Sequence, residues 1–225
     1  MMNNLNKRII TSIILIFTLI LMFFFNYILL IGLILISLIS WLEFNNLILK
    51  IFKKKIYIFM FRVFAFIYLI IFSSIFFNLS TMSAQSKFLL LYFILISIFT
   101  DMGGYVFGKF FKGKKLTKIS PNKTISGTVG SFIFSILLYY FLVSNDFYLN
   151  IIMINLQTNF ENLLLLVTIV VSFSSQLGDL FISYIKRLAK MKDTGKILPG
   201  YGGLLDRIDG MLFGIPSGLI VINFF

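Results

Sequence analysis

The residues best suited to chemistry gather in one stretch of this 225-residue chain, which runs from Ser183 to Asp209 and reads SYIKRLAKMKDTGKILPGYGGLLDRID. Only 12% of the sequence is charged, yet lysines, arginines and aspartates crowd together here with glycines and a proline. Basic side chains bind phosphate groups, and aspartates bind the divalent cations that accompany phosphates. The stretch therefore predicts a site for phosphate groups bridged by a divalent cation.

A glycine-rich loop, Pro199–Gly203, lies inside this stretch. Such a loop lets the backbone approach a ligand closely, and its N–H groups can cradle phosphate oxygens. Asp206 and Asp209 follow at an expected helix start, where their spacing places them on one face. Because the chain has no His, this pair of carboxylates suits Mg²⁺ that is also held by substrate phosphates.

Two further aspartates, Asp101 and Asp179, lie inside apolar runs. They precede the basic residues Lys109 and Lys186, which places each about 10–12 Å from a basic boundary in a helix. Two carboxylates at similar depth in apolar segments are costly unless they face a polar cavity or a cation. We interpret both as site residues; structural pairing of each aspartate with a nearby lysine is the alternative.

Helical spacing extends this polar face beyond Asp179. Ser183, Lys186 and Lys190 follow at intervals that repeat on one side of a helix. They predict a helix that continues to Met191 and presents a carboxylate, a hydroxyl and ammonium groups together. A basic helix that only contacts lipid headgroups is the alternative, and it explains the lysines but not the aspartate.

A third cluster reads Ser120-Pro121-Asn122-Lys123-Thr124. It has the composition of a helix start, and helix N-termini attract anions. Its glycine spacing differs from that of a Walker A loop. Lys123 and Thr124 are therefore candidate phosphate-binding residues, with an ordinary helix cap as the alternative.

The composition as a whole is that of a membrane protein. Hydrophobic residues make up 59% of the chain, more than a soluble domain can shelter. The chain has no Cys and no His, which excludes disulfides and thiolate or imidazole catalysis and leaves zinc without its usual ligands. The net charge of +12 indicates loops that face anionic lipid rather than nucleic acid.

The apolar runs predict an all-α, polytopic transmembrane helical bundle with about seven spans. Two spans are expected within Ile9–Leu42, as a tight hairpin whose one plausible break is offered by Asn26-Tyr27 and Gly32. The others are expected at Tyr57–Phe77, Phe88–Gly108, Ser126–Val143, Leu163–Ile185 and Gly210–Phe225. The short run Ile151–Leu156 is expected at the membrane interface. The first run lacks a small-residue cleavage site, which favours a span over a signal peptide.

The positive-inside rule orients this layout. With the N-terminus inside, every Lys and Arg except Lys87 lies on the cytoplasmic side. The rule predicts a multi-pass protein of the inner (cytoplasmic) membrane whose polar site faces the cytoplasm. We divide the chain into N-terminal transmembrane helices (1–90) and a catalytic transmembrane region (91–225).

These motifs resemble the signature of the phosphatidate cytidylyltransferase (CDP-diacylglycerol synthase) family. The elements S-x-x-K-R, K-D and P-G-H-G-G-x-x-D-R-x-D match, with every spacing kept, Ser183, Lys186-Arg187, Lys192-Asp193, Pro199–Gly203, Asp206-Arg207 and Asp209. The elements D-x-x-[AG]-Y-x-x-G-[KR], S-P-x-K-T-x-x-G and G-D-L match Asp101, Gly104, Tyr105, Gly108 and Lys109, then Ser120, Pro121, Lys123, Thr124 and Gly127, and finally Gly178-Asp179-Leu180. One position departs from the pattern, because Tyr201 replaces the family's His, and a phenol donates a hydrogen bond without becoming cationic.

The resemblance implies transfer of CMP from CTP to phosphatidate, which gives CDP-diacylglycerol and pyrophosphate for phospholipid synthesis. It implies metal binding by Asp179, Asp206 and Asp209, with Mg²⁺ alone or with a second cation, and catalytic roles for these residues together with Lys186 and Arg187. The implied substrate-binding residues are Asp101, Lys123, Thr124, Ser183, Lys192, Asp193, Gly200, Gly202, Gly203 and Arg207. The expected partners are CTP, phosphatidate and membrane lipids, with no nucleic acid, and the chain acts alone or as a homodimer.

Two other functions stay open at this point. One is another CTP-dependent lipid-modifying enzyme of the same superfamily, such as a lipid kinase. The other is a cation-coupled transporter in which Asp101 and Asp179 bind the travelling cation. A transporter leaves Asp206, Asp209 and the glycine loop unexplained, and the sequence shows no inverted repeat.

Overall fold

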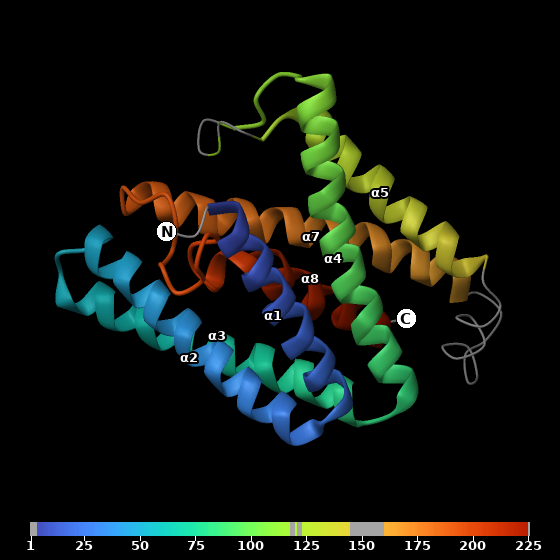
Figure 1. Cartoon of the computed structure of the whole chain (residues 1–225), viewed down its shortest axis with the longest axis horizontal. Helices are drawn as coiled ribbons and strands as arrows, with labels where there is room; N and C mark the ends of the chain where they lie inside the picture. Colours follow the sequence, from blue (N-terminus) through green and yellow to red (C-terminus); the bar gives the residue numbers. More distant parts are fainter. Residues whose placement is uncertain (1–3, 118–119, 121–122, 145–159, 225) are drawn as a thin grey trace. The chain divides into compact units, whose positions relative to one another are not determined.

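In a computed structural model that describes residues 4–117, 120, 123–144 and 160–224, the chain is almost entirely α-helical (Figure 1). The helices are α1 (Asn4–Phe24), α2 (Asn26–Ile51), α3 (Lys55–Thr81), α4 (Ala84–Phe111), α5 (Ile125–Val143), α7 (Phe160–Leu188) and α8 (Leu205–Phe224). Among the described residues the only β pairing consists of two isolated bridges, Lys115 with Thr124 and Leu198 with Gly202. The predicted all-α class is confirmed.

Five helices in the described part of the chain are long and apolar enough to cross a membrane. They are α2, α3, α4, α5 and residues Glu161–Leu188 of α7. A shorter apolar stretch, Ile10–Phe24, lies in α1, and α8 covers the last expected span. The prediction of a polytopic helical membrane protein is confirmed, and Ile151–Leu156 lies outside the described residues.

The first hairpin turns at the start of the predicted break. Phe25 separates α1 from α2 and has an extended backbone with φ −121° and ψ 109°. The break therefore falls beside Asn26, and Gly32 lies inside α2. The end of the Met22 side chain lies beside Gly32.

Helix α2 continues nine residues past the expected end of its span, from Leu42 to Ile51. Glu43 and Asn45 therefore belong to the helix, and both are buried. Polar residues directly after an apolar run normally indicate that a span has ended. Here the helix continues through them, and both side chains are covered by other parts of the protein.

Helix α7 ends at Leu188, before the expected end at Met191. Lys190 has a left-handed backbone with φ 55°. The Met191 N–H donates to the Lys186 carbonyl (2.8 Å), and the Lys190 N–H donates to the Arg187 carbonyl (3.0 Å). These are the two bonds of a Schellman cap. The prediction that Lys190 shares the helical face of Asp179 was therefore wrong, because the helix closes before that residue.

The described chain divides into two compact units. One comprises Met1–Asn78 and Ile185–Ile208, and the other comprises Leu79–Tyr184 and Asp209–Phe225. Helices α7 and α8 each contribute residues to both units. The expected division into residues 1–90 and 91–225 stays a prediction.

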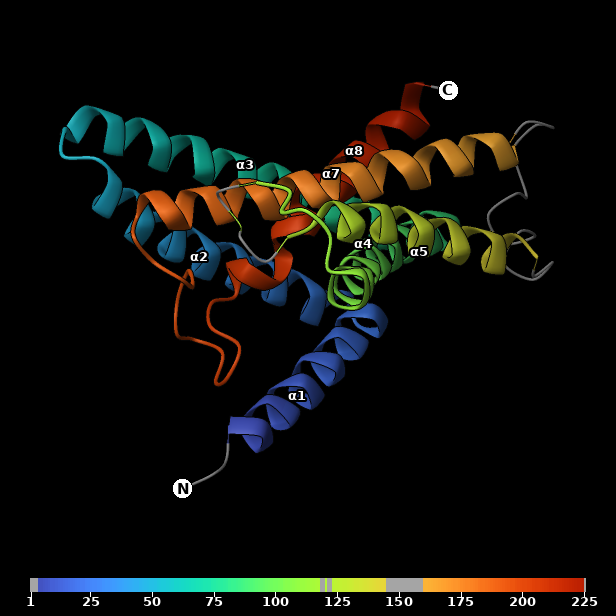
Figure 2. The ribbon, with the colours of Figure 1, turned by 90° about the horizontal axis from the view of Figure 1, so that it is seen from above.

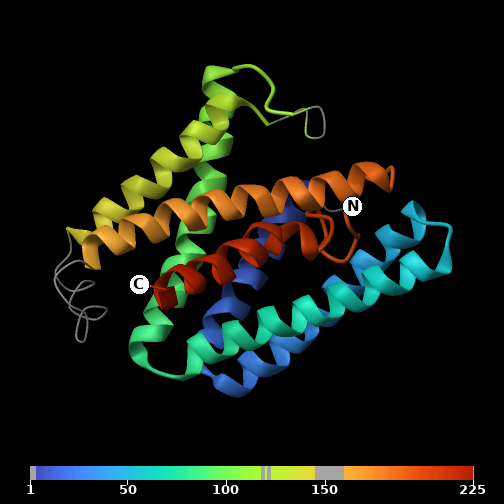
Figure 3. The ribbon, with the colours of Figure 1, turned by 180° about the vertical axis from the view of Figure 1, so that it is seen from behind.

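In the first unit, α2 and α3 run side by side (Figures 1 and 3). Ser37 Oγ and Ser73 Oγ share a hydrogen bond (2.5 Å), and the Trp41 Nε1–H donates to the Arg62 carbonyl (3.1 Å). The same unit holds residues 189–204, which we call the central loop. Figure 2 shows this loop as the irregular connection between α7 and α8.

In the second unit, α4 and α5 pack closely as an antiparallel pair (Figure 1). A Cβ added at Gly103 would lie 2.3 Å from the Gly130 carbonyl oxygen, and one at Gly130 would lie 2.3 Å from Phe107 Cβ. Ser131 Oγ also donates to the Thr100 carbonyl (2.8 Å). Small residues and an interhelical hydrogen bond are typical of packing between membrane helices.

Close packing also joins α7 and α8 within the second unit. A Cβ added at Gly178 would lie 2.3 Å from the Asp209 carbonyl oxygen, and one at Gly210 would lie 2.4 Å from Ser175 Oγ. The residue before Asp179 must therefore be small so that α8 can approach. The glycine of the G-D-L element serves helix packing.

Candidate active site

A pocket of about 330 Å³ opens among α4, α5 and α7 in the second unit. Its lining includes four predicted site residues, namely Asp101, Lys123, Thr124 and Asp179. They come from three motifs that are distant in sequence. The close packing of Gly103 against Gly130 brings two of these motifs together, because it holds α4 and α5 at short range.

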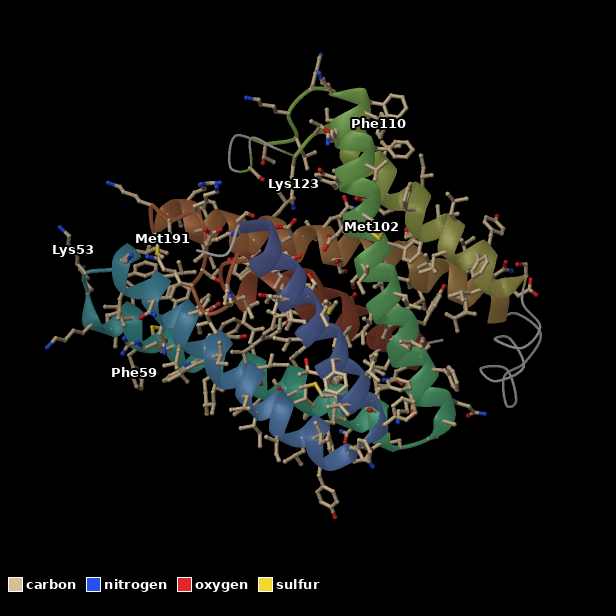
Figure 4. The ribbon with its side chains drawn as sticks, in the orientation of Figure 1. Lys53, Phe59, Met102, Phe110, Lys123 and Met191 are labelled. Atoms are coloured by element: carbon tan, nitrogen blue, oxygen red, sulfur yellow. The ribbon has the colours of Figure 1, made fainter. Side chains whose placement is uncertain are left out.

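Lys123 and Asp179 form an ion pair in the wall of this pocket. Lys123 Nζ lies 2.5 Å from Asp179 Oδ2, and the two side chains are 25% and 31% exposed. Figure 4 shows Lys123 on the segment that precedes α5, with its side chain directed toward α7. Ser183 Oγ donates to the other oxygen of Asp179 (3.3 Å). The aspartate thus has a lysine partner, as the structural alternative proposed, but the pair stays accessible from the pocket.

Thr124 begins α5 as its N-cap. Its backbone is extended, and its hydroxyl accepts a hydrogen bond from the Gly127 N–H (3.1 Å). This satisfies one N–H group that the first helical turn leaves unpaired. The predicted helix start is confirmed, and substrate binding by Thr124 stays a prediction.

Gln176 is a pocket residue that the sequence analysis did not single out. Its side-chain Nε2 is buried and has no hydrogen-bond partner among the described residues. A buried amide donor without a partner is costly, and a ligand oxygen would satisfy it. No sequence signal distinguished this glutamine from other polar residues of α7.

A second polar cluster lies in the first unit, around Asp206. Lys186 Nζ contacts Asp206 Oδ1 at 2.6 Å, and the two side chains are 13% and 7% exposed. Asp206 Oδ2 accepts hydrogen bonds from the Thr194 N–H (2.8 Å), the Thr194 hydroxyl (3.1 Å) and the Gly203 N–H (3.4 Å). Both carboxylate oxygens of Asp206 therefore have protein partners.

The central loop turns at Pro199 and Gly200. The Tyr201 N–H donates to the Leu198 carbonyl (3.0 Å), and Gly200 has a φ of +83°. Proline followed by a residue with positive φ is the pattern of a type II turn, which explains why glycine stands at position 200. Gly202 also has a positive φ, +88°.

Three of the N–H groups that this loop was expected to offer to phosphates already have acceptors. The N–H groups of Tyr201 and Gly202 donate to the Leu198 carbonyl, and that of Gly203 donates to Asp206. Phosphate binding by Gly200, Gly202 and Gly203 stays a prediction. In this structure the conformation of the turn accounts for the first two of these glycines.

Tyr201, the position that departs from the family pattern, contacts α1 and Arg207. Its hydroxyl shares a hydrogen bond with Ser12 Oγ (2.6 Å). The guanidinium of Arg207 lies 4.9 Å from the centre of the tyrosine ring, and Arg207 Nη2 donates to the Tyr201 carbonyl (3.1 Å). The ring thus orients a predicted phosphate-binding arginine through a cation–π contact.

The remaining predicted residues differ in exposure. Asp209 is buried, and its Oδ1 accepts from the Gly210 N–H (2.9 Å). Arg187, Lys192 and Asp193 are exposed, and Asp101 is exposed where it lines the pocket.

Sequence reasoning missed Glu43, the acidic residue of α2. It is 2% exposed and accepts hydrogen bonds from Thr194 and from the start of α8. It is the only acidic residue before Asp101 and follows an apolar run directly. The signal used for Asp101 and Asp179, an acid in an apolar segment, would have found it if the span had not been ended at Leu42.

The described residues contain no group of three or more acidic side chains that could hold a metal ion by themselves. Mg²⁺, however, is commonly held by one or two carboxylates together with substrate phosphates and waters. Asp179 fits this requirement, because it is a partly exposed carboxylate in the wall of a polar pocket. At Asp206 a cation would have to compete with Lys186 and Thr194.

Comparison with known proteins agrees with these motifs. The model of the Cytidylyltransferase family matches residues 2–225. A Staphylococcus haemolyticus protein named phosphatidate cytidylyltransferase is 46% identical over 129 residues, which are 56% of this chain and 46% of that protein. Proteins of the same name from Staphylococcus epidermidis and Staphylococcus aureus are 44% identical over 137 residues (60% of this chain, 49% of that protein) and 43% identical over 132 residues (56% and 46%).

The helices define a multi-pass membrane protein. The match over residues 2–225 shows that the chain belongs to the cytidylyltransferase family. The chain spans about half the length of the curated relatives that it matches.

Proposed function

We propose that the protein transfers CMP from CTP to phosphatidate and releases CDP-diacylglycerol and pyrophosphate. The name of its relatives supports these substrates. The observation that carries the proposal is the Lys123–Asp179 pair in the wall of the pocket. A lysine and a carboxylate beside a cavity of this kind suit a polyphosphate that is bound together with a cation.

In this reaction a phosphate oxygen of phosphatidate attacks the α-phosphorus of CTP. A new P–O bond forms, the bond from the α-phosphorus to the oxygen that bridges to the β-phosphate breaks, and pyrophosphate leaves with the electron pair. The attacking oxygen is already anionic, so the step needs no strong general base. This agrees with a chain that has no His. Alignment and charge neutralisation then supply the catalysis.

Lysines and arginines of this chain would hold and neutralise the phosphate groups. Lys123 does so in the pocket, and the family resemblance assigns the same role to Lys186, Arg187 and Arg207. Lys186 and Arg207 already contact Asp206 and Tyr201. These contacts hold the two cationic groups in place before the substrate arrives, so less order has to be created on binding. The further substrate contacts that we propose are Asp101, Thr124, Ser183, Lys192, Asp193, Gly200, Gly202 and Gly203.

We propose that Asp179, Asp206 and Asp209 hold Mg²⁺, alone or with a second cation. When bound, the cation would neutralise phosphate charge and polarise the α-phosphoryl group. The role of the protein is to present anionic oxygens to the cation. Asp179 does so while one of its oxygens accepts a hydrogen bond from Ser183. The accessibility of Asp179 makes it the first residue to test.

We further propose that the protein lies in the cytoplasmic membrane with its pocket open to the cytoplasm. The asymmetric distribution of Lys and Arg supports this orientation. CTP is then taken from the cytoplasm and phosphatidate from the surrounding membrane lipids. The protein works in this way alone or as a homodimer.

The test is product formation by the purified protein in lipid–detergent micelles. CTP with phosphatidate and Mg²⁺ should give CDP-diacylglycerol. Formation of phosphatidate from CTP and diacylglycerol would instead indicate a CTP-dependent lipid kinase. Absence of any CTP-dependent product would contradict the proposal.

A further inference from the structure

Glu43 is a buried carboxylate on a membrane helix without an ion-pair partner among the described residues. An ionisable group in such a segment is costly, and an apolar side chain would fill the same space at less cost. Its hydrogen bonds therefore indicate what it is for. All of them lead to the segment that carries the signature motif.

The carboxylate of Glu43 closes the N-terminus of α8. Glu43 Oε1 accepts from the Leu204 N–H (3.0 Å), and Oε2 accepts from the Leu205 N–H (2.9 Å). The first N–H groups of a helix have no partner inside the helix, and the helix dipole favours a negative group there. Glu43, a residue of α2, thus caps the N-terminus of α8.

Two glycines of the central loop lie directly against this carboxylate. A Cβ added at Gly195 would lie 2.3 Å from Glu43 Oε1, and one at Gly203 would lie 2.5 Å from Oε2 and 1.9 Å from Thr194 Oγ1. Any larger residue at either position would displace Glu43 or the loop. These glycines therefore allow close packing around Glu43.

Thr194 links Glu43 to Asp206. Thr194 Oγ1 lies 2.8 Å from Glu43 Oε2 and 3.1 Å from Asp206 Oδ2. Its single hydroxyl proton can serve one of the two carboxylates at a time, while the Thr194 N–H holds Asp206 at 2.8 Å. Glu43 is thus connected through Thr194 to Asp206 and to the Lys186 ammonium bound to it.

We propose that Glu43 is a positioning residue for the reaction, because it fixes the central loop and the start of α8 and so sets the orientation of Asp206 and Lys186. The proposal rests on the proposed function only in its effect on turnover. Glu43 does not touch the substrate in this role. Its removal should lower the rate of the chemical step more than the affinity for CTP.

The main variant is Glu43→Gln, which keeps the size of the side chain. An amide offers one acceptor oxygen, so its NH₂ group must face either the Leu204 N–H or the donors on the other side. We expect kcat to fall by ~100-fold, the effect of a small misplacement in an active site, with KM for CTP near the wild-type value. Amide hydrogen exchange at Leu204 and Leu205, followed by mass spectrometry, should become faster.

Thr194 supplies a matched pair of variants that avoids any change in α2. Thr194→Val removes only the hydroxyl link and should lower kcat in the same sense, while Thr194→Ser keeps the hydroxyl and should restore most of it. Ser40→Ala is the control in α2, since Ser40 is buried and its hydroxyl has no hydrogen-bond partner in the described part of the chain. It should leave kcat and exchange unchanged.

Wild-type kcat in Glu43→Gln would overturn the proposal, whether or not exchange becomes faster. If Glu43→Gln does not yield a monodisperse protein, the two Thr194 variants decide. Equal kcat values in Thr194→Val and Thr194→Ser would then overturn the proposal. If the wild type makes no CDP-diacylglycerol, the proposed function fails. The exchange data then still decide whether Glu43 fixes the loop, and unchanged exchange would contradict it.

Discussion

At the scale of single residues, the site depends on how each carboxylate is partnered. Asp179 and Asp206 each pair with one lysine, Lys123 and Lys186, and the exposure of the two pairs differs. The first pair faces a pocket and is open to exchange with a ligand. The side chains of the second pair are largely buried, and its aspartate accepts a hydrogen bond from Thr194 of the central loop. Similar charge pairs thus differ in exposure and, in our proposal, in their tasks.

Tyr201 makes two contacts that can be tested separately, the hydrogen bond of its hydroxyl to Ser12 and the contact of its ring with Arg207. Tyr201→Phe loses the bond to Ser12 but keeps the ring beneath Arg207. One neutral hydrogen bond contributes about 0.5–1.5 kcal/mol, so we expect only a modest loss of turnover. Ser12→Ala should cause the same loss, and the double variant should add nothing further, because both remove one bond. Steady-state kinetics of the three variants measures this.

Restoring the family's residue at the same position is the complementary test. Tyr201→His should retain or raise activity, since the rest of the motif is intact. An inactive histidine variant, or additive losses in the Ser12 and Tyr201 pair, would contradict this account of the tyrosine.

The ionisable residues of the site could be predicted from the sequence, but their hydrogen-bond and ion-pair partners could not. Asp101 and Asp179 were found because acids are rare in apolar segments, and Asp206 and Asp209 because they follow a glycine-rich loop at helical spacing. The pairing of Lys123 with Asp179 depends on the packing of α5 against α4 and α7, which no local pattern contains. Glu43 was missed because it follows Leu42, where apolar character stops although the helix does not.

At the scale of elements, the apolar runs predicted where the helices lie, and cap geometry decided where they end. Helix α7 stops at Leu188 because a Schellman cap forms at Lys190, a residue type that rarely has positive φ. The sequence offered no glycine there as a signal. Gly178 of the G-D-L element, for its part, permits α7 and α8 to approach each other.

The packing of α4 against α5 gives the prediction at this scale. Gly103→Ala would place a Cβ 2.3 Å from the Gly130 carbonyl oxygen, a backbone atom that cannot move aside alone. We expect a destabilisation of about 1–3 kcal/mol, as is typical of overpacking, and reduced turnover because Lys123 is displaced from Asp179. Thermal unfolding in detergent and steady-state turnover measure the two effects.

Gly104→Ala is the matched control for this change. Its added Cβ would first meet the Ser131 hydroxyl at 2.8 Å, and that hydroxyl can rotate away at the cost of one hydrogen bond, to the Thr100 carbonyl. The unfolding midpoint should therefore fall less than in Gly103→Ala. Equal midpoints in the two variants would show that the close approach at Gly103 does not stabilise the pair.

At the scale of the whole molecule, the distribution of charge orients the protein in the membrane. The chain has no cysteine, so single cysteines report accessibility without background. Lys115→Cys and Lys196→Cys, both at exposed positions, should react with a membrane-impermeant reagent only from the cytoplasmic side. Met82→Cys, exposed between α3 and α4, should react only from the opposite side. Reaction of position 115 or 196 from outside would overturn the orientation.

Transfer of CMP, rather than of the γ-phosphate, can be followed through the fate of a labelled phosphate in CTP. With CTP labelled at the α-phosphate, we expect label in lipid and one pyrophosphate released per lipid labelled. With CTP labelled at the γ-phosphate, all label should appear in pyrophosphate. Asp179→Asn, which keeps the size of the side chain but removes its charge, should lose the lipid label by orders of magnitude. Transfer of the γ-label to lipid, or wild-type labelling by Asp179→Asn, would contradict the account.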